Sequence, residues 1–190
     1  MQLLRYLLYS VTLLSPVLCR AQTPACDSIV WRADKKLTWD DFKAVPNAND
    51  LAAARTRSNF VREWRVSKNE LKTKMICFFS PCLSWSKNKA SERLLRHEQG
   101  HFDITELYKR LYYKRIVEAT YTPATLQAVV TIIYRNITQE CGNFQDAYDR
   151  ETNHSLKEDK QSEWEQKIGA LLKNLEAYDR EEVSVSLVRR

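Results

Sequence analysis

The sequence predicts an α+β fold, in which a small antiparallel sheet precedes a helical half. Residues 28–80 contain short runs in which apolar and polar residues loosely alternate, which is typical of strands. From about residue 87 the apolar residues recur at spacings of three and four, the period of an amphipathic helix. No internal repeat or low-complexity segment interrupts the chain, so residues 22–190 are expected to form one domain.

The N-terminus resembles a secretory signal peptide over residues 1–21. Arg5 gives a basic start, and the apolar run 7–18 has the length of a signal core but is too short to cross a membrane. Small residues before Gln22 suggest cleavage there, and an uncleaved anchor is the alternative. We therefore predict a periplasmic or secreted protein with no stable membrane insertion after signal cleavage.

The first third of the mature chain should form the sheet. A short strand is expected near 28–33, followed by a turn or short helix at 38–41. The runs 52–66 and 71–80 read as two further strands. The short connection 67–70 between them favours an antiparallel hairpin.

A long helix is expected next, because residues 90–120 hold no proline and carry one apolar stripe. The segment 120–125 should end it. Thr122 is a candidate cap for the following helix, with Pro123 at its first helical position.

Two more helices follow in the predicted order. The second carries its apolar stripe over 126–148, with Gly142 as a point where it could bend. The third covers roughly 156–180 and has a charged outer face. The tail 183–190 is expected to be an edge strand or disordered.

Four cysteines would remain after signal removal, and an exported chain favours two disulfides. Cys77 and Cys82 flank a short segment that could be a hairpin tip, so they could pair with each other. Cys26 and Cys141 would then form the second bridge. Buried free thiols are the alternative.

The charge balance gives little sign of a polyanionic partner. The full chain has a formal net charge of +6, and removal of Arg5 and Arg20 leaves 28 basic against 24 acidic residues. No dense stripe of Lys and Arg with interleaved aromatics is present. We predict an ordinary basic surface and no nucleic-acid binding.

Residues 97–101 read HEQGH, which matches the motif H-E-x-x-H inside the strongest helical segment. Residues four apart lie above one another on a helix, so His97 and His101 can bind one metal ion, predicted to be zinc. Glu98 would stand beside the ion as general base for a bound water, whose pKa zinc lowers from about 16 to about 7. Gly100 costs helix stability, which suggests that another chain segment approaches closely there. Two core histidines without a metal are the alternative.

A catalytic zinc usually has three protein ligands and one open position. The remaining histidine, His154, is the predicted third ligand, and Asp149 and Glu151 are its competitors. Tyr148 ends the apolar stripe nearby and is a candidate catalytic donor to a developing oxyanion, or else a core aromatic.

Two acidic residues follow the motif on the same helix. Asp103 or Glu106 could accept the second ring N–H of a ligating histidine, although Asp103 lies only two residues from His101 and so points elsewhere on the helix. Solvated surface positions are the alternative for both.

The segments LTWDDF (37–42), HEQGHFDITELYKR (97–110) and YDRETNHS (148–155), followed by QSEW (161–164), resemble the bacterial family called domain of unknown function nine-two-two. Its members are described as predicted secreted or periplasmic zinc-dependent proteases. The resemblance implies metal binding by His97 and His101, catalysis by Glu98, and a signature role for His154. Ser155 stands where the family pattern has glycine.

Motif and resemblance together predict a zincin-like zinc metallopeptidase that acts on peptide or protein substrates. The strand at about 71–80 would flank the cleft and could bind an extended peptide by backbone pairing. A non-catalytic zinc-binding or interaction module of the cell envelope is one alternative. An amidase acting on cell-wall peptides is another.

Overall fold

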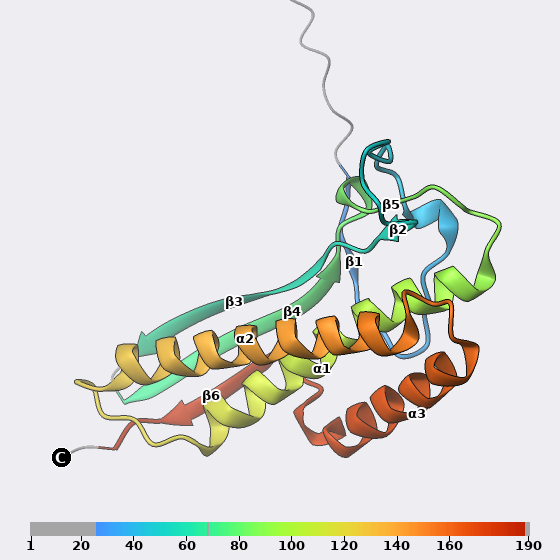
Figure 1. Ribbon diagram of the computed structural model, residues 1–190. Coiled ribbons are helices and arrows are strands. Elements are labelled where there is room, and N and C mark those ends of the chain that lie inside the picture. Colours follow the sequence, from blue (N-terminus) through green and yellow to red (C-terminus); the bar gives the residue numbers. More distant parts are fainter. Residues whose placement is uncertain (1–25, 68, 189–190) are drawn as a thin grey trace, which may run out of the picture.

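The computed structural model describes residues 26–67 and 69–188, so the predicted signal peptide at 1–21 lies outside the described residues. The predicted α+β fold is confirmed. A small antiparallel sheet lies against helices α1 and α2, and α3 packs beside them (Figure 1).

The main sheet is built around the hairpin that the sequence predicts. Strands β3 (Ser58–Ser67) and β4 (Glu70–Phe79) pair along their whole length. On its other edge β4 pairs with β1 (Ile29–Val30) and with β6 (Glu182–Ser186). The C-terminal tail is therefore an edge strand over 182–186, the first of the two states expected for it.

In the gap between β1 and β6, the backbone groups on this edge of β4 also have hydrogen-bond partners. Trp31 N donates to Cys77 O at 3.0 Å, and Met75 N donates to Glu181 O at 2.7 Å. Because both edges of β4 already have partners, the prediction that this strand binds an extended peptide by backbone pairing is wrong.

A separate two-stranded sheet pairs β2 (Ala54–Arg55) with β5 (Trp85–Ser86). It lies beyond the end of the main sheet, on the side where α1 begins (Figure 1). The short helix η1 (Trp39–Asp41) forms at the predicted turn, where the Asp41 carboxylate accepts from Thr38 N at 2.7 Å.

Helix α1 (Glu92–Glu118) matches the predicted helix closely. Helix α2 (Leu126–Thr152) begins one turn later than predicted. Thr122 and Thr125 instead exchange two hydrogen bonds between the backbone N–H of one and the hydroxyl of the other. These bonds form a capping box at Thr122, the predicted cap, and Leu126 N also donates to Thr122 O at 3.0 Å, but the regular helix begins only at Leu126.

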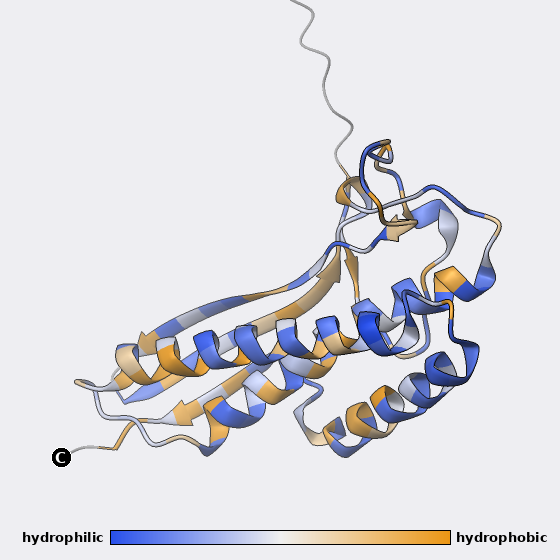
Figure 2. Cartoon of the chain, in the orientation of Figure 1, coloured by the Kyte–Doolittle hydropathy of each residue, from blue (hydrophilic) through white to orange (hydrophobic). Residues whose placement is uncertain are grey.

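Helix α3 (Glu158–Asn174) and the short helix η3 (Glu176–Tyr178) form where the third helix is expected. Figure 2 shows hydrophilic and hydrophobic residues in alternating bands along α2 and α3, in keeping with helices that bury one face. The core lies between these helices and the inner face of the sheet, and its fully buried residues include Phe42, Met75, Phe79, Phe102, Ile104, Tyr112 and Ile137. Among the described helices, none is both long enough and apolar enough to cross a membrane.

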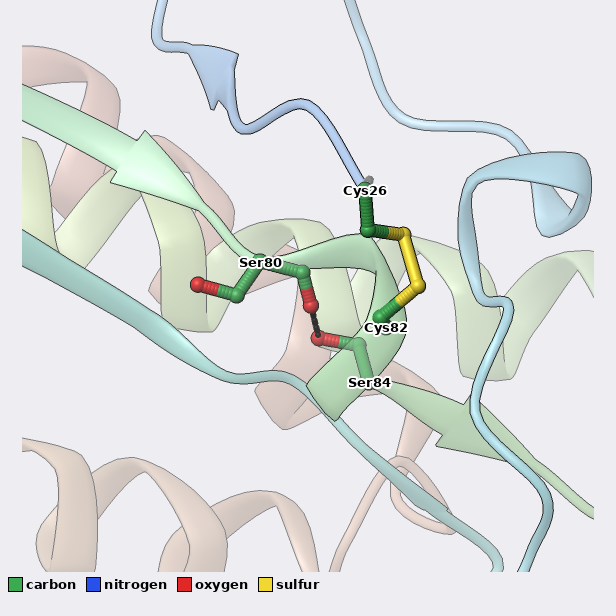
Figure 3. Close-up of a disulfide and its surroundings, with 4 residues drawn as sticks. All are labelled: Cys26, Ser80, Cys82 and Ser84. Carbon is green, nitrogen blue, oxygen red and sulfur yellow. Dashed lines mark hydrogen bonds between the residues drawn. A yellow bond between two sulfur atoms is a disulfide. The ribbon is translucent and has the colours of Figure 1, made fainter. Parts of the chain in front are cut away.

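The disulfide connectivity differs from the predicted one. Cys26 is bonded to Cys82, which lies on the short helix η2 (Pro81–Leu83) (Figure 3). Cys77 and Cys141 are free, as in the alternative of unpaired thiols. The segment after Cys77 continues β4 instead of turning, so Cys77 points into the core and cannot face Cys82. Burial raises the pKa of the Cys77 thiol well above its usual value.

Candidate metal centre

The motif lies in the first half of α1, which begins where Ser91 Oγ accepts a hydrogen bond from Leu94 N. His97 and His101 are one turn apart and face inward, as the spacing predicts. The side chain of His97 is 2 % exposed and that of His101 is 16 % exposed. Their Nε2 atoms are 3.2 Å apart, so both rings present the same nitrogen to one point.

Asp149, near the C-terminal end of α2, completes this group. Its Oδ1 lies 3.1 Å from His97 Nε2 and 3.0 Å from His101 Nε2. These three residues are the one group of metal-ligand type found in the described part of the chain. Antiparallel packing of α2 against α1 brings Asp149 to the motif across 48 residues of sequence.

His154, the predicted third ligand, lies beside this group but outside it. Its side chain is 73 % exposed, and its Nδ1 is 3.6 Å from Asp149 Oδ1. Glu151, the other competitor, is turned away and accepts a hydrogen bond from Trp164 Nε1 at 2.9 Å. Of the three candidates named from the sequence, Asp149 therefore lies in ligand position.

The backbone around His154 is unusual. Asn153, His154 and Ser155 all have positive φ, at 48°, 51° and 75°. Residues with a Cβ rarely adopt this region, and each such residue costs roughly 1 kcal/mol or more. The strained run ends α2 and turns the chain directly beside Asp149.

Gln161, from α3, fixes the orientation of the His97 ring. Its Nε2 donates to Tyr148 Oη at 2.7 Å and to Glu165 Oε1 at 3.0 Å, so its Oε1 must be the atom 3.1 Å from His97 Nδ1. An amide oxygen only accepts, so His97 Nδ1 carries the proton. His97 Nε2 is then left with a free lone pair.

Gln145, from α2, does the same for His101. Its Nε2 donates to the backbone oxygen of His101 at 3.0 Å, and its Oε1 faces His101 Nδ1 in a short contact. His101 therefore also carries its proton on Nδ1. Neither glutamine was predicted from the sequence. Two signals are available in the sequence: Gln145 lies four residues before Asp149, on the same face of α2, and Gln161 opens the family-like segment QSEW.

With both rings neutral, three acceptor atoms therefore converge with no proton among them. Two imidazole nitrogens and a carboxylate oxygen lie 3.0–3.2 Å apart, where their lone pairs would repel one another without a shared cation. Donor atoms about 2.1 Å from a tetrahedral ion would be about 3.4 Å apart. The residues present therefore fit a divalent metal ion with an open coordination position.

The charges of the three residues also favour a bound cation. Burial alone would raise the pKa of Asp149, but its contacts with His101 and His97 lower it well below the usual range. Burial of His101 opposes its protonation, yet the Asp149 and Glu98 carboxylates outweigh this and raise its pKa. The group is thus anionic and favours a positive charge at this point, either a proton or a cation.

Tyr148 is a buried positioning residue in this arrangement. Its ring stacks on His97 with centroids 4.6 Å apart, and its hydroxyl donates to the backbone oxygen of His97 at 3.1 Å. Because the one phenolic proton is already used, the predicted role as a catalytic oxyanion donor has no support in this geometry. Burial also raises the pKa of Tyr148 above its usual value. The alternative, a core aromatic, fits instead.

Gly100 is the residue that admits this ring. A Cβ at position 100 would lie 2.3 Å from Tyr148 Oη and 2.7 Å from its Cζ. The expectation that the motif glycine allows close approach of another chain segment is confirmed, and the segment is α2.

Glu98 is 3 % exposed, and its Oε2 is a buried atom without a hydrogen-bond partner in the described structure. Such an orphaned carboxylate oxygen is costly unless a water or ligand meets it. Its backbone oxygen accepts from Thr56 Oγ1 at 3.2 Å, just after β2.

Asp103 and Glu106 do not orient the histidines. Asp103 accepts from Trp31 Nε1 at 2.7 Å, and Glu106 pairs with Lys109 and Arg110 at 2.9 and 2.8 Å. Both lie on the side of α1 away from α2. The two glutamines take the place predicted for these carboxylates.

Replacing Gln161 by alanine is expected to weaken zinc affinity by about 10–100-fold, because His97 loses the partner that fixes its tautomer. Gln161→Glu keeps an acceptor for His97 Nδ1 and should recover part of this loss. Isothermal titration with zinc measures both. Gln166→Ala, at an exposed position of the same helix, should bind as the wild type does. Equal affinity of Gln161→Ala and wild type would contradict the assignment.

Comparison with known proteins gives one match. Residues 82–155 match a family model described as "Bacterial protein of unknown function (DUF922)". The matched stretch contains the whole motif on α1 and extends through Asp149 and His154. No curated protein and no solved structure matches the chain. The match supports the resemblance seen in the sequence and assigns no activity.

Proposed function

We propose that this chain is an exported zinc-dependent hydrolase, most simply a peptidase with a zincin-like arrangement. One observation carries the proposal: His97, His101 and Asp149 converge on one point while Glu98, buried beside them, keeps a carboxylate oxygen free. A module that only bound a metal would have no use for a costly unpartnered carboxylate at that place.

Zinc fits the donor set better than other common ions. Two imidazoles and one carboxylate form a three-ligand set of the kind seen in catalytic zinc sites, whereas magnesium and calcium prefer oxygen ligands alone. A zinc ion held there would supply a Lewis acid that polarises a carbonyl and makes water acidic.

Glu98 would be the general base. Its Oε2 would take a proton from the attacking water and later give it to the leaving amine. Burial keeps competing water away from this oxygen, and the stacked Tyr148 and the two glutamines hold the neighbouring histidines still. Rigid support of this kind is what a catalytic geometry needs.

The substrate would approach between α1 and the end of α2. Thr56 contacts the backbone of Glu98 on one side, and the exposed His154 stands beside Asp149 on the other. His154 could therefore donate an N–H to the substrate. Its strained backbone is consistent with a position that function requires.

The disulfide between Cys26 and Cys82 supports export, since such bonds persist in oxidising compartments. A periplasmic or secreted location therefore remains part of the proposal. Peptide or protein substrates remain part of it as well.

Glu98→Gln tests the proposal directly. The variant is expected to bind zinc as wild type does and to lose about 10²–10⁴-fold in kcat. The assay combines metal analysis with digestion of a broad peptide library that includes cell-wall peptides. A chelator should abolish wild-type cleavage and lower the melting temperature, because zinc binds only the folded chain.

Two results would contradict the proposal in different ways. Wild-type cleavage by Glu98→Gln would remove the general-base role. Stoichiometric zinc with no hydrolysis of any peptide would favour the non-catalytic module. Cleavage confined to cell-wall peptides would identify the amidase alternative.

A further inference from the structure

The outer edge of β3 is open. Within residues 26–67 and 69–188, β4 is the one strand that pairs with β3. The backbone groups of Met75 and Cys77 point away from β3, toward the other edge of β4. The residues that alternate with them along β4 therefore direct their backbone groups toward β3. By the register, the backbone groups of Arg62, Trp64 and Val66 therefore point to the open edge.

Apolar side chains line this edge. Trp64 is 36 % exposed and Val66 is 47 % exposed, although both lie on the face that carries the helices. The helices therefore leave this end of the edge uncovered. Val61, on the opposite face, is 46 % exposed. Exposed edges of this length are usually covered, shortened or bulged.

Two charges flank Trp64 on the outer face of the sheet. Within the described residues, neither Glu63 nor Arg65 forms a salt bridge. The register places Arg65 directly opposite Lys72, a like charge. Lys72 contacts Glu70 at 3.5 Å, so Arg65 is the cation of this pair that has no acid within the described residues.

We propose that this edge binds the same edge of a second copy of the chain. A two-fold axis through Trp64 sets the two β3 strands antiparallel. Arg62 then lies opposite Val66 of the second copy, and Trp64 lies opposite its symmetry mate. These are the residues whose backbone groups are free, so each such pair exchanges two hydrogen bonds.

The same axis places Glu63 of each copy opposite Arg65 of the other. This is a non-hydrogen-bonded pair, in which side chains lie closest. Each Glu63 carboxylate, which lies opposite Lys74 in its own sheet, then also meets Arg65 of the other copy. Charges of one sign would protect an edge from pairing, whereas opposite charges two residues apart are self-complementary under two-fold symmetry.

The joined sheets would carry the helices of both copies on one face and bury both Trp64 side chains. An edge-to-edge contact is small for a protein interface. We therefore expect a reversible dimer with a micromolar dissociation constant. This inference is independent of the proposed hydrolase activity.

Sedimentation velocity over a concentration series tests it, with the chain as purified after signal removal and at physiological salt. Wild type should dimerise. Glu63→Arg and Arg65→Glu should each raise the dissociation constant on the order of tenfold or more, because each substitution creates two like-charge contacts per dimer. The double variant Glu63→Arg/Arg65→Glu restores opposite charges and should restore the dimer.

Glu182→Arg is the matched control, because it makes the same charge change on β6, at the other edge of the sheet. It should dimerise as wild type does. Thermal melts of all variants exclude unfolding as the cause. Wild type that stays monomeric through the high-micromolar range would overturn the proposal, and so would a double variant that remains as monomeric as the single ones.

Discussion

Replacing Asp149 by alanine is expected to abolish stoichiometric zinc binding. Among the described residues, Asp149 Oδ1 is the one carboxylate oxygen that lies within 3.1 Å of both His97 Nε2 and His101 Nε2. Two histidines alone leave an incomplete site, and His154 is too exposed to replace the carboxylate without moving its strained backbone. Metal content after dialysis against a zinc buffer, together with calorimetric titration, measures the loss.

The competing residues provide the controls. Glu151→Gln should keep zinc, because its carboxylate contacts Trp164 and not the histidines. His154→Ala should also keep zinc, with any loss confined to kcat or KM. The reverse pattern, in which His154→Ala loses zinc and Asp149→Ala keeps it, would show that the histidine predicted from the sequence is the third ligand.

Gly100→Ala is expected to destabilise the fold by about 2–3 kcal/mol despite the better helix propensity of alanine. The added Cβ would lie 2.3 Å from Tyr148 Oη. That ring cannot retreat, because it is fully buried, stacks on His97 and accepts from Gln161. The clash therefore reaches the metal site, and zinc affinity should fall as well. Chemical denaturation and zinc titration measure the two effects.

Two other helical glycines serve as controls for this substitution. Gly142 on α2 and Gly169 on α3 have open space where a Cβ would stand. Gly142→Ala and Gly169→Ala should each stabilise the chain by up to about 1 kcal/mol. Equal stabilisation by Gly100→Ala would mean that Tyr148 does not pack against the motif.

Local periodicity was enough to predict much of this molecule. The hairpin of β3 and β4, the three long helices and the inward face of the motif all follow from residues close in sequence. Local periodicity predicts the ends of helices less accurately, as the late start of α2 shows. There, Thr122 and Thr125 exchange the two hydrogen bonds of a capping box, yet the regular helix begins only at Leu126.

Partners distant in sequence could not be predicted in the same way. Spacing suggested that Cys77 pairs with Cys82, but the direction of Cys77 depends on where β4 ends. It also suggested Asp103 and Glu106 as supports for the histidines, since they lie on the same helix. The actual supports, Gln145 and Gln161, come from two other helices, and although Gln161 opens the segment QSEW, neither its spacing nor its residue type links it to His97.

The sequence by itself determined the α+β class, the helix that carries HEQGH, and the pairing of His97 with His101 on one face, because the helical period makes these properties local. Only the tertiary structure decided that Asp149 completes the metal group, that the Tyr148 hydroxyl donates to the backbone oxygen of His97, and that two glutamines set both ring tautomers. These contacts form where α2 and α3 pack on α1, and their geometry depends on helix packing that no local pattern encodes.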